Sequence, residues 1–267
     1  MDPDKIMLIR YPILENSAGV EAFTTTRQGG TSEGNYASLN MGFNSGDTPE
    51  RVRTNRERVG KRLLVEAERM IFPKQTHSAH VKIIDETFFA LSPDDKSLFL
   101  ADTDALITSL PDVCIAVKTA DCVPVLIFDP VHAVAAAIHA GWRGTLQQIV
   151  RLTVETMQHQ MGCLPENMVA AIGPAISADV YEVGEEVWHH FDPRFLKENK
   201  QSGKRLLDLR EANRAQLLHA GVSVQNIGLY AQYCSFQQPE MFYSARRDGA
   251  QTGRMASGII IRQTGNR

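Results

Sequence analysis

The sequence predicts a mixed α/β or α+β fold, and two features of its 267 residues support that prediction. Apolar runs of strand length alternate in part with longer segments of helical periodicity. Hydrophobic residues make up 43% of the chain and the net charge is -3. This composition excludes a disordered protein, because disorder requires low hydrophobicity and high net charge. No repeat or Gly/Ser/Pro-rich linker divides the sequence, so we expect a single domain over residues 1–267.

The first long helix is predicted after a polar, glycine-rich loop at residues 29–47. Thr48 resembles a helix N-cap and Pro49 occupies the first helical position, and the helix is expected to reach about Met70. Five arginines within it are balanced by glutamates, so we interpret it as a solvated helix face rather than a nucleic-acid surface.

Strands dominate the middle of the chain. The sequence is apolar without alternation at residues 113–118, 123–128 and 133–140, where we expect three central strands covered on both sides. The last two of these would form an antiparallel hairpin that turns at Asp129-Pro130. The strands expected in this region are residues 70–74, 81–84, 104–108, 113–118, 123–128 and 133–140.

The C-terminal half continues with both kinds of element. A helix capped by Thr145 is expected to reach about Met161, because its apolar residues form one stripe. Further strands are expected at residues 169–173, 225–229 and 257–262, and further helices at residues 180–190 and 208–220.

Composition also bears on location and partners. The first residues lack the layout of a signal peptide, and the four cysteines form no CxxC pair, so we expect a cytoplasmic protein with reduced thiols. No apolar run approaches the ~18 residues of a membrane span. The slight negative charge gives no electrostatic reason to bind nucleic acid or anionic lipid. The sequence carries no signal for an oligomeric state.

Metal-capable side chains lie beside predicted turns and strand ends in three short segments. Cys122 begins one apolar strand and His139 lies near the end of the next, so the predicted hairpin would bring both to one end of the sheet. His77 would have to be brought there by the fold. Two imidazoles and one thiolate suit zinc and leave a fourth position for water or substrate. Such a centre has a net charge of about +1, polarises water and attracts an anion.

Two neighbours of these ligands suggest further roles. Arg143 and the N-terminus of the following helix lie beside His139, where both would favour an anion. Asp121 precedes Cys122 and is interpreted either as a group that orients a ligand or moves a proton, or as a capping carboxylate.

Three segments, KQTHSAHV, KTADCVPVLIFDP and AAIHAGWRGT, resemble the signature blocks of the YfiH-like laccase-domain family. Other matching blocks extend the resemblance from about residue 20 to residue 262. Members of this family have been labelled polyphenol oxidases, peptidoglycan editing factors and purine nucleoside phosphorylases. The resemblance implies a layered αββα-type fold with mixed sheets, related to cysteine deamidases. It also implies a zinc site formed by His77, Cys122 and His139.

The resemblance further implies the reaction. Adenosine, inosine, guanosine or methylthioadenosine would react with phosphate to give free base and ribose 1-phosphate, with some deamination of adenosine. The partners are then a small-molecule nucleoside and phosphate. Zinc and Arg143 would orient phosphate, and Arg27 is a second candidate for that role. By family position Gln75 and Asn40 are candidate ribose or base contacts, with a structural role for Asn40 left open.

Competing interpretations use the same residues differently. In a hydrolase, deamidase or peptidoglycan-editing enzyme, Cys122 would be the nucleophile, His139 the base and a nearby Asp the orienting group. Copper is an alternative or adventitious metal, because Cu²⁺ outcompetes Zn²⁺ in most N/S sites. Laccase chemistry is disfavoured, because the chain has eight histidines and no HxH pair. A structural zinc site would need a fourth ligand, for which the sequence offers no convincing candidate.

Overall fold

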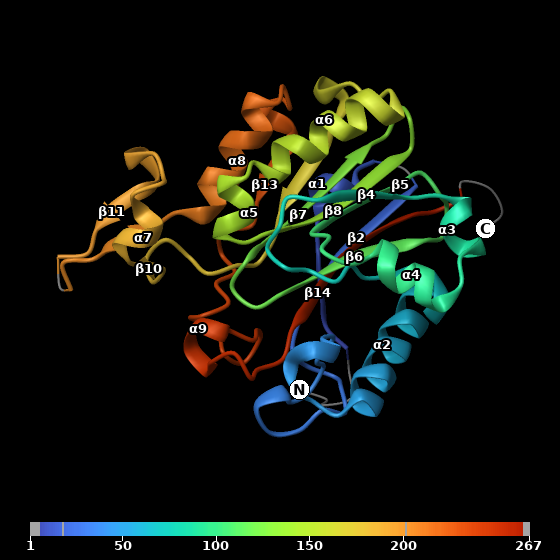
Figure 1. Cartoon of the computed structure of the whole chain (residues 1–267), viewed down its shortest axis with the longest axis horizontal. Helices are drawn as coiled ribbons and strands as arrows, with labels where there is room; N and C mark the ends of the chain where they lie inside the picture. The colour runs from blue at the N-terminus through green and yellow to red at the C-terminus, as the bar shows by residue number, and fades with distance from the viewer. Residues whose placement is uncertain (1–5, 18, 201, 264–267) are drawn as a thin grey trace.

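Two large β-sheets pack face to face in the computed structural model, which describes residues 6–17, 19–200 and 202–263 (Figure 1). A much smaller third sheet projects to one side together with a short helix, α7. The five-stranded sheet has the order β1 (Leu8–Arg10), β2 (Val20–Thr25), β14 (Met255–Ile261), β6 (Cys114–Thr119) and β3 (Met70–Ile71). The six-stranded sheet has the order β13 (Ile227–Leu229), β9 (Val169–Ile172), β7 (Val123–Asp129), β8 (Val134–Ala140), β5 (Ala105–Thr108) and β4 (Val81–Ile84). The small sheet has the order β10 (Glu182–Val183), β12 (Arg205–Leu207) and β11 (Leu196–Glu198).

Helices cover the outer faces of the two large sheets (Figure 1). Three of them, α5, α6 and α8, lie on the six-stranded sheet, and α2 lies on the five-stranded sheet. The α-helices of the described residues are α1 (Pro12–Glu15), α2 (Pro49–Leu63), α3 (Glu86–Ala90), α4 (Pro93–Phe99), α5 (Trp142–Leu146), α6 (Ile149–Met161), α7 (Glu185–Trp188), α8 (Leu209–His219) and α9 (Ala245–Asp248).

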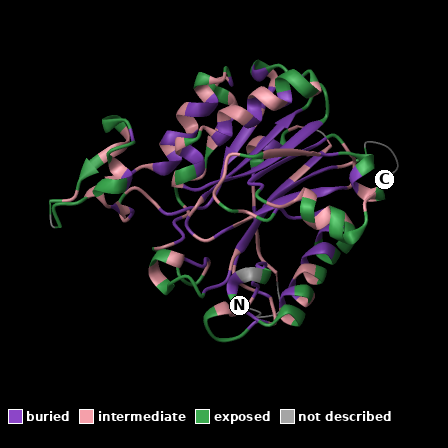
Figure 2. Ribbon diagram, viewed as in Figure 1, coloured by how far each residue is buried: buried purple, intermediate pink, exposed green. Residues whose placement is uncertain are grey.

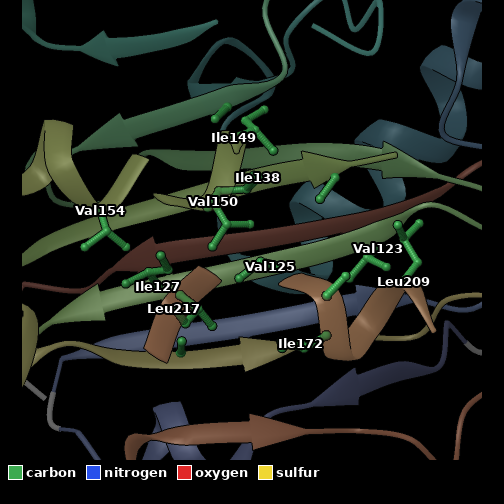
Figure 3. Packing of buried hydrophobic residues seen from close by; sticks show 14 of the residues in the cluster. Val123, Val125, Ile127, Ile138, Ile149, Val150, Val154, Ile172, Leu209 and Leu217 are labelled. Atoms are coloured by element: carbon green, nitrogen blue, oxygen red, sulfur yellow. The ribbon is translucent and has the colours of Figure 1, made fainter. Parts of the chain in front are cut away.

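Apolar side chains fill each interface between layers, so the central strands of both sheets are buried, whereas edge strands such as β4 and β13 are partly exposed (Figure 2). Ile138 of β8 packs with Val150 of α6 and Leu217 of α8 on the outer face of the six-stranded sheet (Figure 3). Ile115 of β6 and Leu126 of β7 belong to the cluster between the sheets. The mixed α+β class and the αββα layering expected from the resemblance are therefore confirmed.

The β7–β8 hairpin positions the site. All residues of both strands are buried, which confirms the prediction of central strands covered on both sides. The strands pair antiparallel, with Val123 opposite Ala140. Asp129 Oδ1 accepts hydrogen bonds from the main-chain N–H groups of Val131 (2.7 Å) and His132 (3.2 Å), which fixes the predicted turn.

Helix boundaries depart from the predictions at two places that matter for the site. Helix α2 ends at Leu63 rather than near Met70, because Leu64 adopts a left-handed conformation with φ of 52° and Val65 N–H bonds back to Gly60. Thr145 is not an N-cap: α5 begins at Trp142 with Gly141 as its N-cap.

Other departures are smaller. Gln148, with φ of 63°, separates α5 from α6. The expected strand 70–74 is restricted to Met70–Ile71. The expected helix 180–190 contains a short strand, β10, followed by only one helical turn, α7. Within the described residues, none of the helices has the length and apolar character needed to cross a membrane.

Candidate metal centre and its cavity

Three side chains from distant parts of the chain converge at one end of the six-stranded sheet. Cys122 directly precedes β7, and His139 lies on β8 in register with Pro124. His77 lies in the loop before β4, in a left-handed conformation with φ of 65°. The sequence predicted that Cys122 and His139 would share a sheet end, and the fold brings His77, the third residue implied by the resemblance, to the same place.

The spacing of these three residues fits one metal ion. Their ligand atoms all lie within 4.8 Å of one another, and His77 Nε2 is 3.8 Å from Cys122 Sγ. Zinc bonds of about 2.3 Å to sulfur and about 2.0 Å to nitrogen in a tetrahedron place the sulfur ~3.5 Å from each nitrogen and the two nitrogens ~3.3 Å apart. Borderline N and S donors of this kind suit zinc and, for the same reason, copper.

Asp104, which lies immediately before β5, organises two of the three ligands. Its Oδ1 accepts a 2.7 Å hydrogen bond from His139 Nδ1. The other ring nitrogen of His139, Nε2, is therefore the one available to bind a metal. Oδ1 also accepts from the main-chain N–H of His77 at 3.1 Å. Oδ2 accepts from the N–H and the hydroxyl of Ser78, both at 2.8 Å. A carboxylate behind a ligating histidine fixes its tautomer and raises its basicity.

Charge coupling across the cluster shows in its pKa values. Burial alone would raise the pKa of Cys122, but the nearby His139 and His77 outweigh it and lower that pKa to about 6. Burial alone would lower the pKa of His139, but Cys122 and Asp104 raise it to about 9. For Asp104, burial is outweighed by hydrogen bonds from His139 and Thr76, and its pKa falls to about 2. Without a metal, the cluster is thus a thiolate–imidazolium pair supported by a carboxylate.

Gly141 leaves room for the converging side chains. A Cβ atom at this position would lie 2.7 Å from His77 Cδ2 and 3.1 Å from Cys122 Sγ. Its φ of -74° is accessible to any residue, so the requirement for glycine is steric.

The cluster opens onto a cavity of about 760 Å³ between the sheet ends, helix α2 and the segment around α9. This volume lies within the range of about 300–1,000 Å³ that is usual for small-molecule sites. The residues that line it are Gly42, Phe43, Ser45, Arg56, Phe72, Pro73, Lys74, Gln75, His77, Lys118, Ala120, Asp121, Cys122, His139, Tyr181, Ala245, Arg246, Ala250 and Arg254.

Gln75 and Asn40, the two candidate substrate contacts, occupy different environments. Gln75 lines the cavity, and its amide forms two hydrogen bonds with the main chain of Lys118, at 2.7 and 2.8 Å. Asn40 is fully buried behind the cavity. Its Oδ1 accepts from the main-chain N–H of Arg254 and its Nδ2 donates to Asp47, both at 2.9 Å. Both amide atoms of Asn40 are therefore hydrogen-bonded within the protein.

The two arginines expected to hold phosphate lie outside this cavity. Arg27 donates to the carbonyls of Ala37 and Pro239 and stacks on Tyr243. Arg143 stacks on Trp142 and lines a neighbouring cavity of about 600 Å³. The two cavities share Tyr181 and Arg246, so Arg143 lines a cavity adjacent to that of the centre, whereas Arg27 lines neither of the two.

Asp121 lines the cavity and is buried, with φ of 89°. Its Oδ1 accepts from the Ser235 hydroxyl and its Oδ2 from the main-chain N–H of Arg246, both at 2.7 Å. The carboxylate therefore holds the start of the segment that contains α9.

Sequence reasoning missed Asp104 and three cations of the cavity, which are Arg56, Lys118 and Arg254. Arg56 was expected on a solvated helix face, but its guanidinium is partly buried between the rings of Phe43 and Phe72, 4.3 and 4.0 Å from their centroids. Lys118 carried a usable signal, since a lysine inside a strand expected to be buried on both faces requires an explanation.

A second group of metal-capable side chains lies at the opposite end of the hairpin. Asp129, His132 and Cys163 have ligand atoms within 4.8 Å of one another. Asp129 already accepts from two main-chain N–H groups of the turn and lies 3.1 Å from His132 Nδ1. Its contacts are those of a turn-stabilising carboxylate.

Together the fold and the three converging ligands define a class of protein, an αββα structure with a candidate mononuclear metal centre that opens onto a cavity. The chain belongs to the family described as multi-copper polyphenol oxidoreductase laccase, whose sequence model matches residues 21–262. This finding confirms the resemblance stated above.

Several proteins are similar to this chain over nearly its whole length. A purine nucleoside phosphorylase of Bacteroides thetaiotaomicron is 43% identical, with 97% of both chains covered. The adenosine deaminase RL5 of an unknown prokaryotic organism is 39% identical, covering 95% of this chain and 98% of that one. The crystal structure of YlmD from Geobacillus stearothermophilus superposes with a TM-score of 0.87 at 33% identity, covering 98% of this chain and all of that chain.

Proposed function

We propose that this chain is a zinc-dependent purine nucleoside phosphorylase that deaminates adenosine as a second activity. The observation that carries the proposal is the convergence of His77, Cys122 and His139 on one point at the wall of a cavity of about 760 Å³. The names of the relatives at 43% and 39% identity supply the two reactions. In phosphorolysis, a purine nucleoside reacts with phosphate to give the free base and ribose 1-phosphate.

His77, Cys122 and His139 would hold the metal. When bound, zinc supplies Lewis acidity, which stabilises developing negative charge and lowers the pKa of water. Asp104 keeps the proton on His139 Nδ1 and fixes the loop that carries His77. These three residues would supply three protein ligands, the number typical of zinc sites that also bind water or substrate.

The cavity residues would orient the two substrates. Phosphate must approach the anomeric carbon as the bond to the purine breaks, and holding two reactants in line is worth up to about 7–11 kcal/mol. Gln75 would contact ribose or base from the cavity wall, and Arg143 is retained as a cation near the opening. Asp121 would act indirectly, by holding the segment that carries Arg246.

A second candidate function is supported by the contact between His139 and Asp104. Cys122, His139 and Asp104 form the thiol–imidazole–carboxylate series of a cysteine hydrolase, and the lowered pKa of Cys122 suits a nucleophile. His77 argues for the metal enzyme, since a Cys–His–Asp hydrolase has no use for a second imidazole facing the thiol.

The two functions are separated by one set of assays on the zinc-loaded and metal-depleted protein. Base release from adenosine is measured with and without phosphate, and inosine formation is followed in parallel. We expect phosphate-dependent base release that disappears on metal removal and returns with zinc. Full activity of the metal-depleted protein would instead support the thiol mechanism. Cys122→Ala is expected to lose both metal and turnover, and retained phosphorolysis would overturn the assignment.

A further inference from the structure

Three of the cations that line the cavity beside the candidate metal centre are partly buried, whereas Lys74 and Arg246 of the same lining are exposed. Arg56 comes from α2, Lys118 from the end of β6 and Arg254 from the segment before β14, and all three line the cavity together with His77, Cys122 and His139. Each is partly buried. None of the three forms an ion pair within the described parts of the chain. A group of partly buried cations without a counterion is unfavourable unless an anion joins it.

Main-chain carbonyls hold these cations while leaving donors unused. Lys118 Nζ donates to the carbonyl of Pro73 at 2.7 Å, which uses one of its three N–H bonds. Arg56 Nε and Nη2 both donate to Met41 O, and among the described residues its Nη1 has no acceptor. Arg254 donates through its two Nη atoms to carbonyls of residues 250, 252 and 253, and its Nε bonds to none of the described atoms. The three side chains are therefore fixed in place with N–H groups left for a ligand.

Neighbouring residues tie this cation group to the metal centre. Gln75 binds the main chain of Lys118 through both atoms of its amide, and it precedes His77 by two residues. Asn40 Oδ1 accepts from the main-chain N–H of Arg254, and Gly42 leaves the space that Arg254 fills, since a Cβ there would lie 2.8 Å from Arg254 Cγ. Partly buried hydrogen bonds of Gln75 thus set the position of Lys118 relative to the His77 segment, and Asn40 and Gly42 set the position of Arg254.

The electrostatics of the group favour a multivalent oxyanion. Burial and the nearby Arg56 lower the pKa of Lys118 to about 7, while Asp104 opposes this effect. Burial lowers the pKa of Arg56 to about 10. The apolar rings of Phe43 and Phe72 beside Arg56 limit solvent screening and strengthen any charge interaction. A phosphate dianion would relieve the repulsion between the cations and offer acceptor oxygens to their unused N–H groups.

We propose that Arg56, Lys118 and Arg254 form the binding site for inorganic phosphate in this cavity. The inference rests on the proposed function, since it gives phosphorolysis its anion site. It also replaces Arg27 and Arg143 as the principal phosphate contacts. The same chemistry could be met by the phosphate of a nucleoside 5′-monophosphate, so the test includes AMP as a second source.

The test is steady-state kinetics of the zinc-loaded full chain, with phosphate varied at saturating inosine. Lys118→Met is expected to raise the KM for phosphate at least about tenfold and to leave the KM for inosine within about twofold. Arg254→Met is expected to do the same, and Lys118→Arg should recover part of the loss. Lys61→Met, an exposed lysine of α2, is the matched control and should leave both constants unchanged. Metal content and thermal melting are recorded for each variant, and Arg254→Met carries the test if Lys118→Met does not fold.

Direct binding separates the site from the reaction. Isothermal titration of inorganic phosphate into the zinc-loaded protein without nucleoside should show binding that Lys118→Met weakens at least about tenfold. An unchanged phosphate KM and affinity in Lys118→Met overturns the proposed site, as does a larger rise in Arg143→Met. Tighter, Lys118-dependent binding of AMP than of inorganic phosphate also overturns it. If the wild type releases no base with phosphate but still binds phosphate through Lys118, the proposed function fails while the anion site stands.

Discussion

Replacing Asp104 by Asn tests how the protein holds its metal ligands. The carboxylate accepts from His139 Nδ1, from the main-chain N–H groups of Thr76, His77 and Ser78, and from the Ser78 hydroxyl. An amide of the same shape keeps one acceptor oxygen and turns an NH₂ group toward N–H donors. The variant would therefore hold the His139 ring and the loop that carries His77 less firmly in place.

The expected effect follows from known carboxylate–histidine–metal arrangements. Loss of such a partner lowers metal affinity by about 10- to 100-fold. A tenfold change corresponds to about 1.4 kcal/mol, so we expect a loss of about 1.4–2.8 kcal/mol of zinc-binding free energy. The measurement is competition for zinc against a chelating dye at neutral pH, with the wild type and the variant under the same conditions.

Asp102→Asn is the matched control. Asp102 lies two residues away, is exposed, and accepts from the Thr76 hydroxyl while facing His80, outside the ligand set. It should bind zinc as the wild type does. The reasoning is refuted if Asp104→Asn keeps wild-type affinity, or if Asp102→Asn loses as much.

Three further predictions follow from single contacts. The pKa of Asp104 in the folded protein lies near 2, below its ordinary value of 3.8, so the ionised carboxylate stabilises the metal-free protein above about pH 4. About 2 kcal/mol of this unfolding free energy is lost as the pH falls toward 2. Between pH 5 and 2.5 the unfolding free energy, measured with denaturant, should fall less in Asp104→Asn than in the wild type, and an equal fall would contradict this. Gly141→Ala should fold normally by circular dichroism but bind zinc at least about tenfold more weakly, because the new Cβ atom would clash with His77 and Cys122. A wild-type zinc affinity would contradict this and show that the two ligands move aside. Asp121→Asn should lower the unfolding free energy by about 1–3 kcal/mol and leave the zinc affinity near the wild-type value, because the partners of Asp121 are Ser235 and the N–H of Arg246. A selective loss of zinc would assign Asp121 to the metal instead.

The local pattern of the sequence was sufficient for the hairpin that carries two ligands. Residues 123–128 and 133–140 are apolar without alternation, and in the structure Pro124 pairs with His139, which leaves Cys122 and His139 at the same end of the sheet. The turn occupies residues 130–133, because Asp129 still pairs with Val134. Helix ends were harder to predict, because a left-handed Leu64 or Gln148 carries no strong sequence signal, whereas glycine would.

Long-range organisation escaped local reasoning. Asp104 reaches His139 because β5 pairs with β8, and strand order is a property of the whole sheet. Arg56 reads as a surface residue of an amphipathic helix, and only the position of Phe43 and Phe72 shows that it turns inward. Family resemblance supplied His77 as a ligand, and its left-handed backbone is visible only in the fold.

Metal dependence of phosphorolysis tests the central claim most directly. The metal content of wild type and Cys122→Ser is determined after purification without added metal, and purine release from inosine with phosphate is followed before and after zinc is restored. The account predicts about one zinc per wild-type chain, little in the variant, and turnover that follows zinc occupancy. Purine release at full rate from zinc-free protein, or from Cys122→Ser, would contradict it.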